Sequence, residues 1–193
     1  MNRGLKDVDD SIVKVRNIVR YVRSSPARLQ RFRVCAEKKK IPCKSLLKLD
    51  VPTRWNSTYL MLESTEKFQR VFELMQEDDG PLYCSVMEDG LGKKGLGPST
   101  DDDWDTIRAF IKFLKLFYEV TLRMSGTKYA TSSLYFEELS NILGHLTEYT
   151  NSDDLVLSTM AGKMMSKYQK YWGDIEKINR LLFMAAVQTH TTN

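Results

Sequence analysis

Apolar residues recur at helical spacing through most of the chain. Between Val8 and Val22 they follow a four-three rhythm that draws one apolar stripe along a helix, with charged side chains on the opposite side. Comparable stripes occupy five later segments, 27–40, 54–76, 104–124, 133–150 and 154–172, and a last apolar segment covers 175–184. The pattern predicts a mainly α fold, an irregular multi-helix domain of about six or seven helices.

Proline, glycine and acidic residues separate these segments. Ser24-Ser25-Pro26 is expected to end the first helix and begin the second, because proline fits the first turn of a helix. The run 77–81, Glu-Asp-Asp-Gly-Pro, is expected to end the long helix that begins at Arg54. Residues 80–100 contain five glycines and two prolines, so we expect a mobile, acidic and Gly-rich linker over 77–101. Ser99 or Thr100 would cap the next helix, whose Asp101, Asp102 and Asp103 suit the helix dipole better than a metal ion.

Composition describes an ordinary globular protein. The chain has 193 residues, of which 42% are apolar and 28% charged, and this is enough for one domain with a sizeable core. No apolar run has the length of a membrane span, and the first residues do not form a secretion signal. The three cysteines, Cys35, Cys43 and Cys84, match no common zinc pattern, so we interpret them as free thiols of a reducing compartment.

Charge is distributed unevenly along the chain, although the net charge is only +4. Residues 1–50 contain 14 Lys and Arg against 5 Asp and Glu, whereas residues 77–105 contain nine acidic residues against two lysines. Such blocks favour either a polyanion partner for the basic region or internal charge pairing. The candidate polyanion contacts in the two first helices are Arg16, Arg20, Arg23, Arg28, Arg31, Lys38, Lys39 and Lys40. A solvated basic face is the alternative interpretation.

Residues 49–59 hold the residues most suited to contact something outside the fold. Val51 before Pro52 predicts an extended entry, after which Thr53 can cap a helix. Arg54 and Trp55 would then lie in the first turn, where free amides and the helix dipole favour anions. A cation, an indole and free amides can together hold a phosphate and stack on a base. The alternative is that Trp55 is a core anchor and Arg54 a solvated cap.

The sequence contains no catalytic constellation. It has no glycine-rich phosphate loop, no nucleophile elbow and no His/Cys cluster, and only two histidines. We therefore expect no cofactor, no metal site and no small-molecule substrate.

Five stretches together resemble the hAT superfamily of DNA transposases, in particular its ricesleeper- and daysleeper-type domesticated relatives with a BED zinc finger. The most specific is 50–62, with Thr53-Arg54-Trp55-Asn56-Ser57 at its centre, and the others are 21–28, 104–117, 130–139 and 165–178. The resemblance covers residues 4 to about 185. The expected organisation is thus a transposase-like helical region over 1–185, which includes the basic residues 1–50 and the linker 77–101, and a divergent disordered tail over 186–193.

The resemblance implies a function as well as a fold. Family members interrupt an RNase H-like catalytic fold with a large helical insertion, and the three carboxylates that hold two divalent ions lie outside this chain. The chain would then be a non-catalytic, nuclear, DNA-binding fragment of a domesticated transposase, with possible dimerisation with full-length members. Trp55 matches a tryptophan associated with stacking on a distorted or flipped base, and Arg54 matches its basic neighbour. The alternative is a structural or protein-interaction fragment without independent DNA binding.

Overall fold

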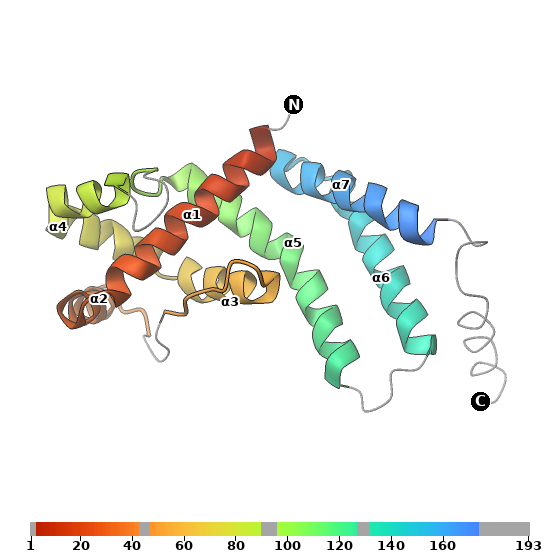
Figure 1. Cartoon of the computed structure of the whole chain (residues 1–193), viewed down its shortest axis with the longest axis horizontal. Coiled ribbons are helices and arrows are strands. Elements are labelled where there is room, and N and C mark those ends of the chain that lie inside the picture. The colour runs from red at the N-terminus through yellow and green to blue at the C-terminus, as the bar shows by residue number, and fades with distance from the viewer. Residues whose placement is uncertain (1–2, 43–46, 90–95, 127–131, 174–193) are drawn as a thin grey trace. The chain divides into compact units, whose positions relative to one another are not determined.

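The fold consists of α-helices throughout the portion of the chain that the structure describes. A computed structural model describes residues 3–42, 47–89, 96–126 and 132–173. Within these ranges it contains seven helices and no strand (Figure 1): α1 (Arg3–Arg23), α2 (Pro26–Lys38), α3 (Trp55–Glu66), α4 (Gln69–Asp89), α5 (Asp101–Gly126), α6 (Ser132–Thr150) and α7 (Leu155–Trp172). The predicted mainly α class and the predicted number of helices are confirmed.

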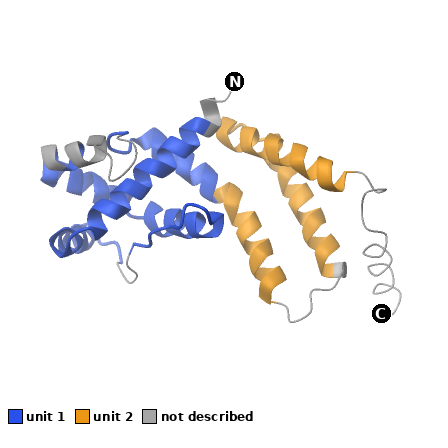
Figure 2. Cartoon of the chain, viewed as in Figure 1, with its two compact units in different colours: residues 1–111 blue, residues 112–193 orange. Residues whose placement is uncertain are grey.

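The chain divides into two compact units, residues 1–111 and residues 112–193 (Figure 2). Each unit is described by itself below. The last predicted apolar segment, 175–184, and the predicted tail, 186–193, lie outside the described residues.

In unit 1, α1 packs against α2, α3 and α4. Its predicted apolar stripe is buried from Val8 to Val22, and Ile18 and Tyr21 are buried with it. The helix begins at Arg3, before the predicted apolar stripe, so the acidic pair Asp9-Asp10 lies inside α1. Ser25 is the residue before α2 and Pro26 is its first residue, as predicted.

An aromatic cluster forms the centre of unit 1. Phe32 of α2 contacts Phe68 edge-on and stacks on Phe72 of α4, with ring centroids 5.0 and 5.6 Å apart. Phe72 in turn stacks on Trp104 of α5, with 6.1 Å between centroids and an interplanar angle of 2°. Burying each of these side chains contributes about 1.5–3 kcal/mol, so the cluster joins three helices through their largest side chains.

The predicted continuous helix over 54–76 is wrong. It is interrupted at Lys67 and Phe68, where a turn separates α3 from α4. Helical spacing of apolar residues continues across this turn, because Phe68 is itself buried in the aromatic cluster. The periodicity therefore gave no sign of the interruption.

The predicted helix end at Gly80-Pro81 is a kink. Gly80 has φ 47° and ψ −121°, a conformation that only glycine adopts readily, and α4 then continues to Asp89. Proline suits the first turn of the resumed helix. Tyr83, which lies in that resumed segment, is buried and packs edge-on against Tyr21 with centroids 5.2 Å apart. Burial of Tyr83 thus favours helix in a segment whose composition indicated a linker.

Unit 2 is built on the packing of α6 against α7. Leu146, Tyr149, Leu157 and Met160 are buried, whereas Leu143 is exposed. Asp154 caps α7 by accepting hydrogen bonds from the amides of Val156 and Leu157 at 2.9 and 3.0 Å. Arg123 of α5 forms an ion pair with Glu138 of α6.

Candidate nucleic-acid interface

The segment that leads into α3 is anchored at one end and exposed at the other. Leu47 is buried, and its carbonyl oxygen accepts a hydrogen bond from Arg23 at 2.9 Å. Leu49 and Val51, by contrast, are exposed. Two apolar side chains thus face solvent immediately before the helix that Trp55 begins.

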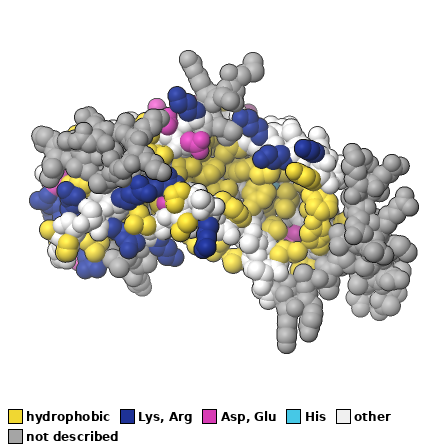
Figure 3. Space-filling view, viewed as in Figure 1, with side chains coloured by type: hydrophobic (Ala, Val, Ile, Leu, Met, Phe, Trp, Pro, Cys, Tyr) yellow, Lys and Arg dark blue, Asp and Glu magenta, His cyan; other side chains and the backbone are white. Residues whose placement is uncertain are grey.

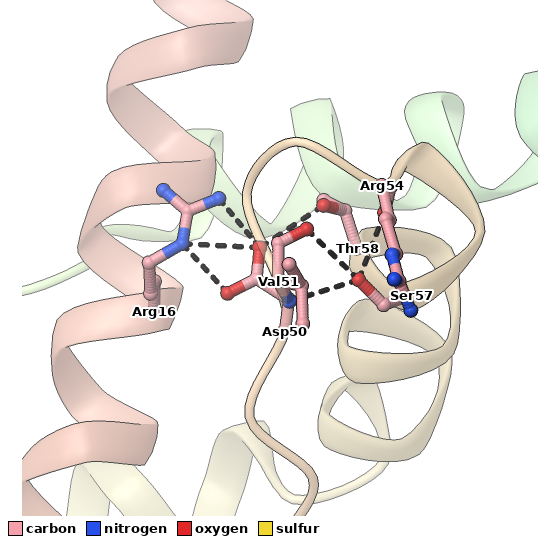
Figure 4. Close-up of polar contacts among 6 residues, drawn as sticks. All are labelled: Arg16, Asp50, Val51, Arg54, Ser57 and Thr58. Carbon is pink, nitrogen blue, oxygen red and sulfur yellow. Dashed lines mark hydrogen bonds and ion pairs between the residues drawn. The ribbon is translucent and has the colours of Figure 1, made fainter.

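The start of α3 differs in detail from the prediction. Arg54, and not Thr53, is the residue before the helix, and its side chain makes no capping bond. Ser57 closes the turn instead: its Oγ accepts from the Val51 amide at 2.8 Å and lies 3.0 and 2.8 Å from the carbonyl oxygens of Val51 and Arg54, to either of which it can donate (Figure 4). A serine inside the helix therefore fixes the approach of the chain to it.

Asp50 connects this turn to α1. Its carboxylate accepts from Arg16 Nε at 2.8 Å and from a terminal nitrogen of the same guanidinium at 2.6 Å, in a bidentate pair (Figure 4). Thr58 Oγ1 donates to the same carboxylate at 3.0 Å from α3. The Asp50 side chain is 0% exposed. We call Arg16, Asp50 and Thr58 the clasp.

The charge of Asp50 is well compensated. Burial alone would raise the pKa of its carboxyl group, but hydrogen bonds from Arg16, the positive charge of Arg16 and the bond from Thr58 outweigh burial, so the pKa is lowered. Asp50 is therefore ionised at neutral pH, and Arg16 is its counter-ion.

Trp55 is exposed to solvent over 42% of its surface. The interpretation of Trp55 as a core anchor is therefore wrong, and the buried tryptophan of unit 1 is Trp104, at 2%. Arg54 is exposed and forms no hydrogen bond or ion pair with its side chain within the described ranges of the chain. The amides of Trp55 and Asn56 likewise have no acceptor there, as expected in a first helical turn. A cation, an indole and two free amides thus lie together at this helix start.

The predicted basic residues fall into two groups. Arg16, Arg23, Arg28 and Arg31 have partners inside the fold: Arg28 donates to Ser24 and lies 4.0 Å above the Tyr21 ring, and Arg31 pairs with Asp79. Arg20 also interacts within the chain. Lys38, Lys39 and Lys40, at the end of α2, are exposed and form no hydrogen bond or ion pair with their side chains among the described residues.

A pocket of about 610 Å³ opens beside the lysines at the end of α2. Its walls carry both signs of charge, with Lys39 and Arg70 opposed by Glu73 and Asp101. Arg70, which the sequence interpretation did not single out, is exposed and adds a cation near Lys39. In the view of Figure 3, Lys and Arg side chains are spread over unit 1 with few acidic side chains between them. The charged side chains on that visible face are therefore mainly basic.

The acidic start of α5 has a structural role. Asp103 Oδ2 accepts from the amide and hydroxyl of Thr100 at 2.8 and 2.9 Å, as in a capping box, and from Lys14 Nζ at 2.6 Å. Ser11 donates to its other oxygen at 2.8 Å. Burial alone would raise the pKa of Asp103, but these bonds outweigh burial and lower it. Thr100 is thus the cap, one of the two residues predicted.

Sequence reasoning missed the contacts that organise the site. Asp50 and Arg16 are 34 residues apart, and nothing in the local pattern of either residue indicates that they pair. Ser57 and Thr58 were noted only within the family resemblance, not as partners of Val51 and Asp50. A buried carboxylate in an otherwise exposed segment is visible only in three dimensions.

Two family models match the chain. The model described as ZBED1 RNase-like helical domain matches residues 1–113, and the model described as hAT-like transposase, RNase-H fold, matches residues 133–188. The chain belongs to this family of hAT transposases and transposase-derived proteins, with the RNase-like helical domain as its first 113 residues. The resemblance identified from the sequence is confirmed.

Individual relatives agree with this membership. The chain is 30% identical over 176 residues to the zinc finger BED domain-containing protein RICESLEEPER 2 of Oryza sativa subsp. japonica, covering 91% of this chain and 22% of that protein. It is 29% identical over 169 residues to a putative AC transposase of Zea mays, covering 88% and 20%. Zinc finger BED domain-containing protein DAYSLEEPER of Arabidopsis thaliana is 29% identical over 158 residues, covering 82% and 20%. The chain spans about a fifth of the length of these relatives.

No solved structure gave a significant match to the chain. Among the described residues, no helix is long and apolar enough to cross a membrane.

Proposed function

We propose that this chain is the DNA-contacting helical region of a domesticated hAT-type transposase, and that Arg54 and Trp55 are the centre of its DNA interface. The observation that carries the proposal is the exposed Trp55 ring at the start of α3, next to Arg54 and two amides that have no partner among the residues the structure describes. Stacking of a base on such a ring contributes about 1–3 kcal/mol, and the amides and Arg54 suit an adjacent phosphate. A relative is named as a transposase, a class of enzyme whose substrate is DNA.

The form of DNA that this site suits has an accessible base face. An indole can stack only on a base that is unpaired, flipped or at a distorted step, and the segment before the helix adds two exposed apolar side chains, Leu49 and Val51. We therefore propose that the interface prefers single-stranded or distorted DNA to intact duplex.

Phosphate contacts would come from the basic residues around this centre. Lys38, Lys39 and Lys40 are the strongest candidates, because their charges have no ion-pair partner within the described ranges of the chain. Arg20, Arg23, Arg28 and Arg31 remain predicted contacts, but each would have to keep or exchange a partner inside the fold. Contacts of this kind weaken binding as salt rises, in proportion to the number of phosphates neutralised.

The remaining elements of the proposal concern the whole protein. The chain acts without catalytic activity of its own and without a cofactor, in the nucleus, as one helical region over 1–185. We also propose that the chain dimerises with full-length members of the family.

The test is DNA binding by the purified chain, measured by fluorescence anisotropy with a labelled single strand, a duplex with an unpaired base and a perfect duplex. We expect Trp55→Ala to weaken binding to the first two by roughly 5- to 150-fold, the factor that corresponds to about 1–3 kcal/mol. Trp172→Ala, in unit 2, is the matched control and is expected to leave binding unchanged. Equal binding by wild type and Trp55→Ala would overturn the proposal.

A second candidate function is a structural or protein-interaction fragment without independent DNA binding. The internal pairs Arg31–Asp79, Arg16–Asp50 and Lys14–Asp103 favour it, because they neutralise some of the basic excess inside the fold. This candidate predicts no salt-dependent retention of the chain on DNA.

A further inference from the structure

We propose that the clasp, the buried Arg16–Asp50 ion pair with Thr58, holds Arg54 and Trp55 in their exposed position, so that Arg16 is a positioning residue and not a phosphate contact. This inference rests on the proposed DNA-binding function of Trp55. It changes the role assigned to Arg16 from the sequence.

The clasp is placed to control the turn before α3. Asp50 lies four residues before Arg54, and its carboxylate is bound from α1 by Arg16 and from α3 by Thr58. Ser57 closes the same turn through Val51. The chain between Asp50 and Thr58 is thus tied at both ends, and Arg54 and Trp55 lie within it. Because both ends are already fixed, the segment loses less conformational entropy when DNA binds.

Arg16 is poorly suited to hold a phosphate. Its guanidinium is mostly buried, with 13% of the side chain exposed, and two of its nitrogens already bond the Asp50 carboxylate. Transferring it to DNA would leave a fully enclosed carboxylate without a counter-ion, which costs more than a solvent-exposed phosphate contact returns. The planar fork of arginine also matches the carboxylate in a way that lysine would not.

The chemistry distinguishes the clasp from the exposed lysines at the end of α2. Lys39 is exposed and has no ion-pair partner among the described residues, so removing its charge alters mainly the charge that faces solvent or DNA. Removing Arg16 or Asp50 alters the geometry of the turn. The two kinds of residue should therefore differ in how their substitution changes the salt dependence of binding.

The first experiment compares Arg16→Gln, Asp50→Asn and the double variant in the full chain, by anisotropy with the unpaired-base duplex across a salt series. We expect each single variant to weaken binding by about tenfold, the double variant to weaken it no further, and the slope against salt to stay unchanged. Lys39→Gln is the control. It should reduce the magnitude of the slope of log K against log salt concentration by about one, because one phosphate contact is lost.

A phosphate-contact role for Arg16 predicts the reverse. Asp50→Asn would then release Arg16 and leave binding unchanged or tighter, and Arg16→Gln would lower the slope as Lys39→Gln does. Either result would overturn the inference.

The second experiment needs neither DNA nor the loss of a buried charge. Thr58→Val removes only the hydroxyl bond to Asp50, and Thr65→Val makes the same change at a buried α3 threonine that bonds the Met61 carbonyl oxygen. In protein labelled with 5-fluorotryptophan, the ¹⁹F resonance of Trp55 is identified by its loss in Trp55→Phe. We expect Thr58→Val to shift or broaden it, and Thr65→Val to leave it unchanged.

The two experiments separate the inference from the function on which it rests. If Trp55→Ala binds DNA normally, the proposed function fails, whatever the ¹⁹F spectra show. If Trp55→Ala loses binding but the Trp55 resonance is the same in wild type, Thr58→Val and Asp50→Asn, the function stands and the positioning role of the clasp is wrong.

Discussion

Two helix starts in unit 1 are built from similar components and place their tryptophans in opposite environments. Trp55 begins α3 and Trp104 lies in the first turn of α5, and each start is bound to α1 through an aspartate, Asp50 or Asp103. Trp104 stacks on Phe72 inside the aromatic cluster, whereas Trp55 is exposed. The difference teaches that attachment to α1 does not by itself decide burial. Trp104 is buried where Phe72 of another helix stacks on its ring.

The largest loss of folding stability is expected at the buried tryptophan, Trp104. Trp104→Ala removes a ring stacked on Phe72 and leaves a cavity, so we expect it to lower the free energy of unfolding by about 3–5 kcal/mol. Urea denaturation followed by circular dichroism measures the change. A loss below about 1 kcal/mol would show that the aromatic cluster is not the centre of unit 1.

Breaking the Arg16–Asp50 ion pair of the clasp is expected to lower the free energy of unfolding somewhat less. Arg16→Gln leaves the buried Asp50 carboxylate without its cation, and we expect a loss of about 3 kcal/mol in the free energy of unfolding. Arg28→Gln is the matched control, because Arg28 donates to Ser24 and lies over the Tyr21 ring and forms no ion pair among the described residues, and it should cost no more than about 1 kcal/mol. Equal losses for the two variants, in the same urea titration, would contradict the special role of the Asp50 attachment.

Acid should weaken both helix starts together. The pKa values of Asp50 and Asp103 are lowered in the folded chain, so their pairs contribute stability above the unfolded pKa of about 3.9. That stability is lost as the pH falls from about 4 through the lower folded pKa values. Thermal melts between pH 6 and pH 2 measure it, and Arg16→Gln should show a shallower decline. An unchanged melting temperature down to pH 2 would be inconsistent with these ionised, buried carboxylates.

The smallest expected effect on stability is at the exposed tryptophan. Trp55→Ala should change the free energy of unfolding by roughly 0.5–1 kcal/mol at most, because much of the ring already faces solvent. Urea denaturation beside Trp104→Ala gives the comparison directly. A loss as large as that of Trp104→Ala would mean that Trp55 supports the fold and would remove the basis of its proposed role in DNA binding.

Several features of the fold were predictable because they depend on neighbours in sequence. The α1 stripe, the Pro26 start of α2 and the Thr100 cap of α5, one of two residues predicted, were foreseen, since periodicity, proline and capping chemistry act within a few residues. The break at Lys67-Phe68 and the resumption of α4 after Gly80 were not foreseen. Both follow from the burial of an aromatic ring, Phe68 or Tyr83, against another helix.

The position of the candidate site was predicted from the sequence, but the contacts that hold it in place were not. Family resemblance pointed to Arg54 and Trp55, and the structure shows both exposed at a helix start. Arg16 was grouped with the surface arginines because it falls opposite the apolar stripe of α1. That face of α1 meets Asp50, so a charge predicted for solvent has an internal partner.

The sequence by itself determined the helical class, most helix starts and the family, because each of these depends on residue types at short spacings. Only the tertiary structure decided which tryptophan is buried and which arginine has a partner inside the fold. The burial of Trp104 depends on its contact with Phe72, and the pairing of Arg16 depends on its contact with Asp50. These residues are far apart in the sequence. The free energies of burial and of charge pairing arise only when folding brings such side chains together.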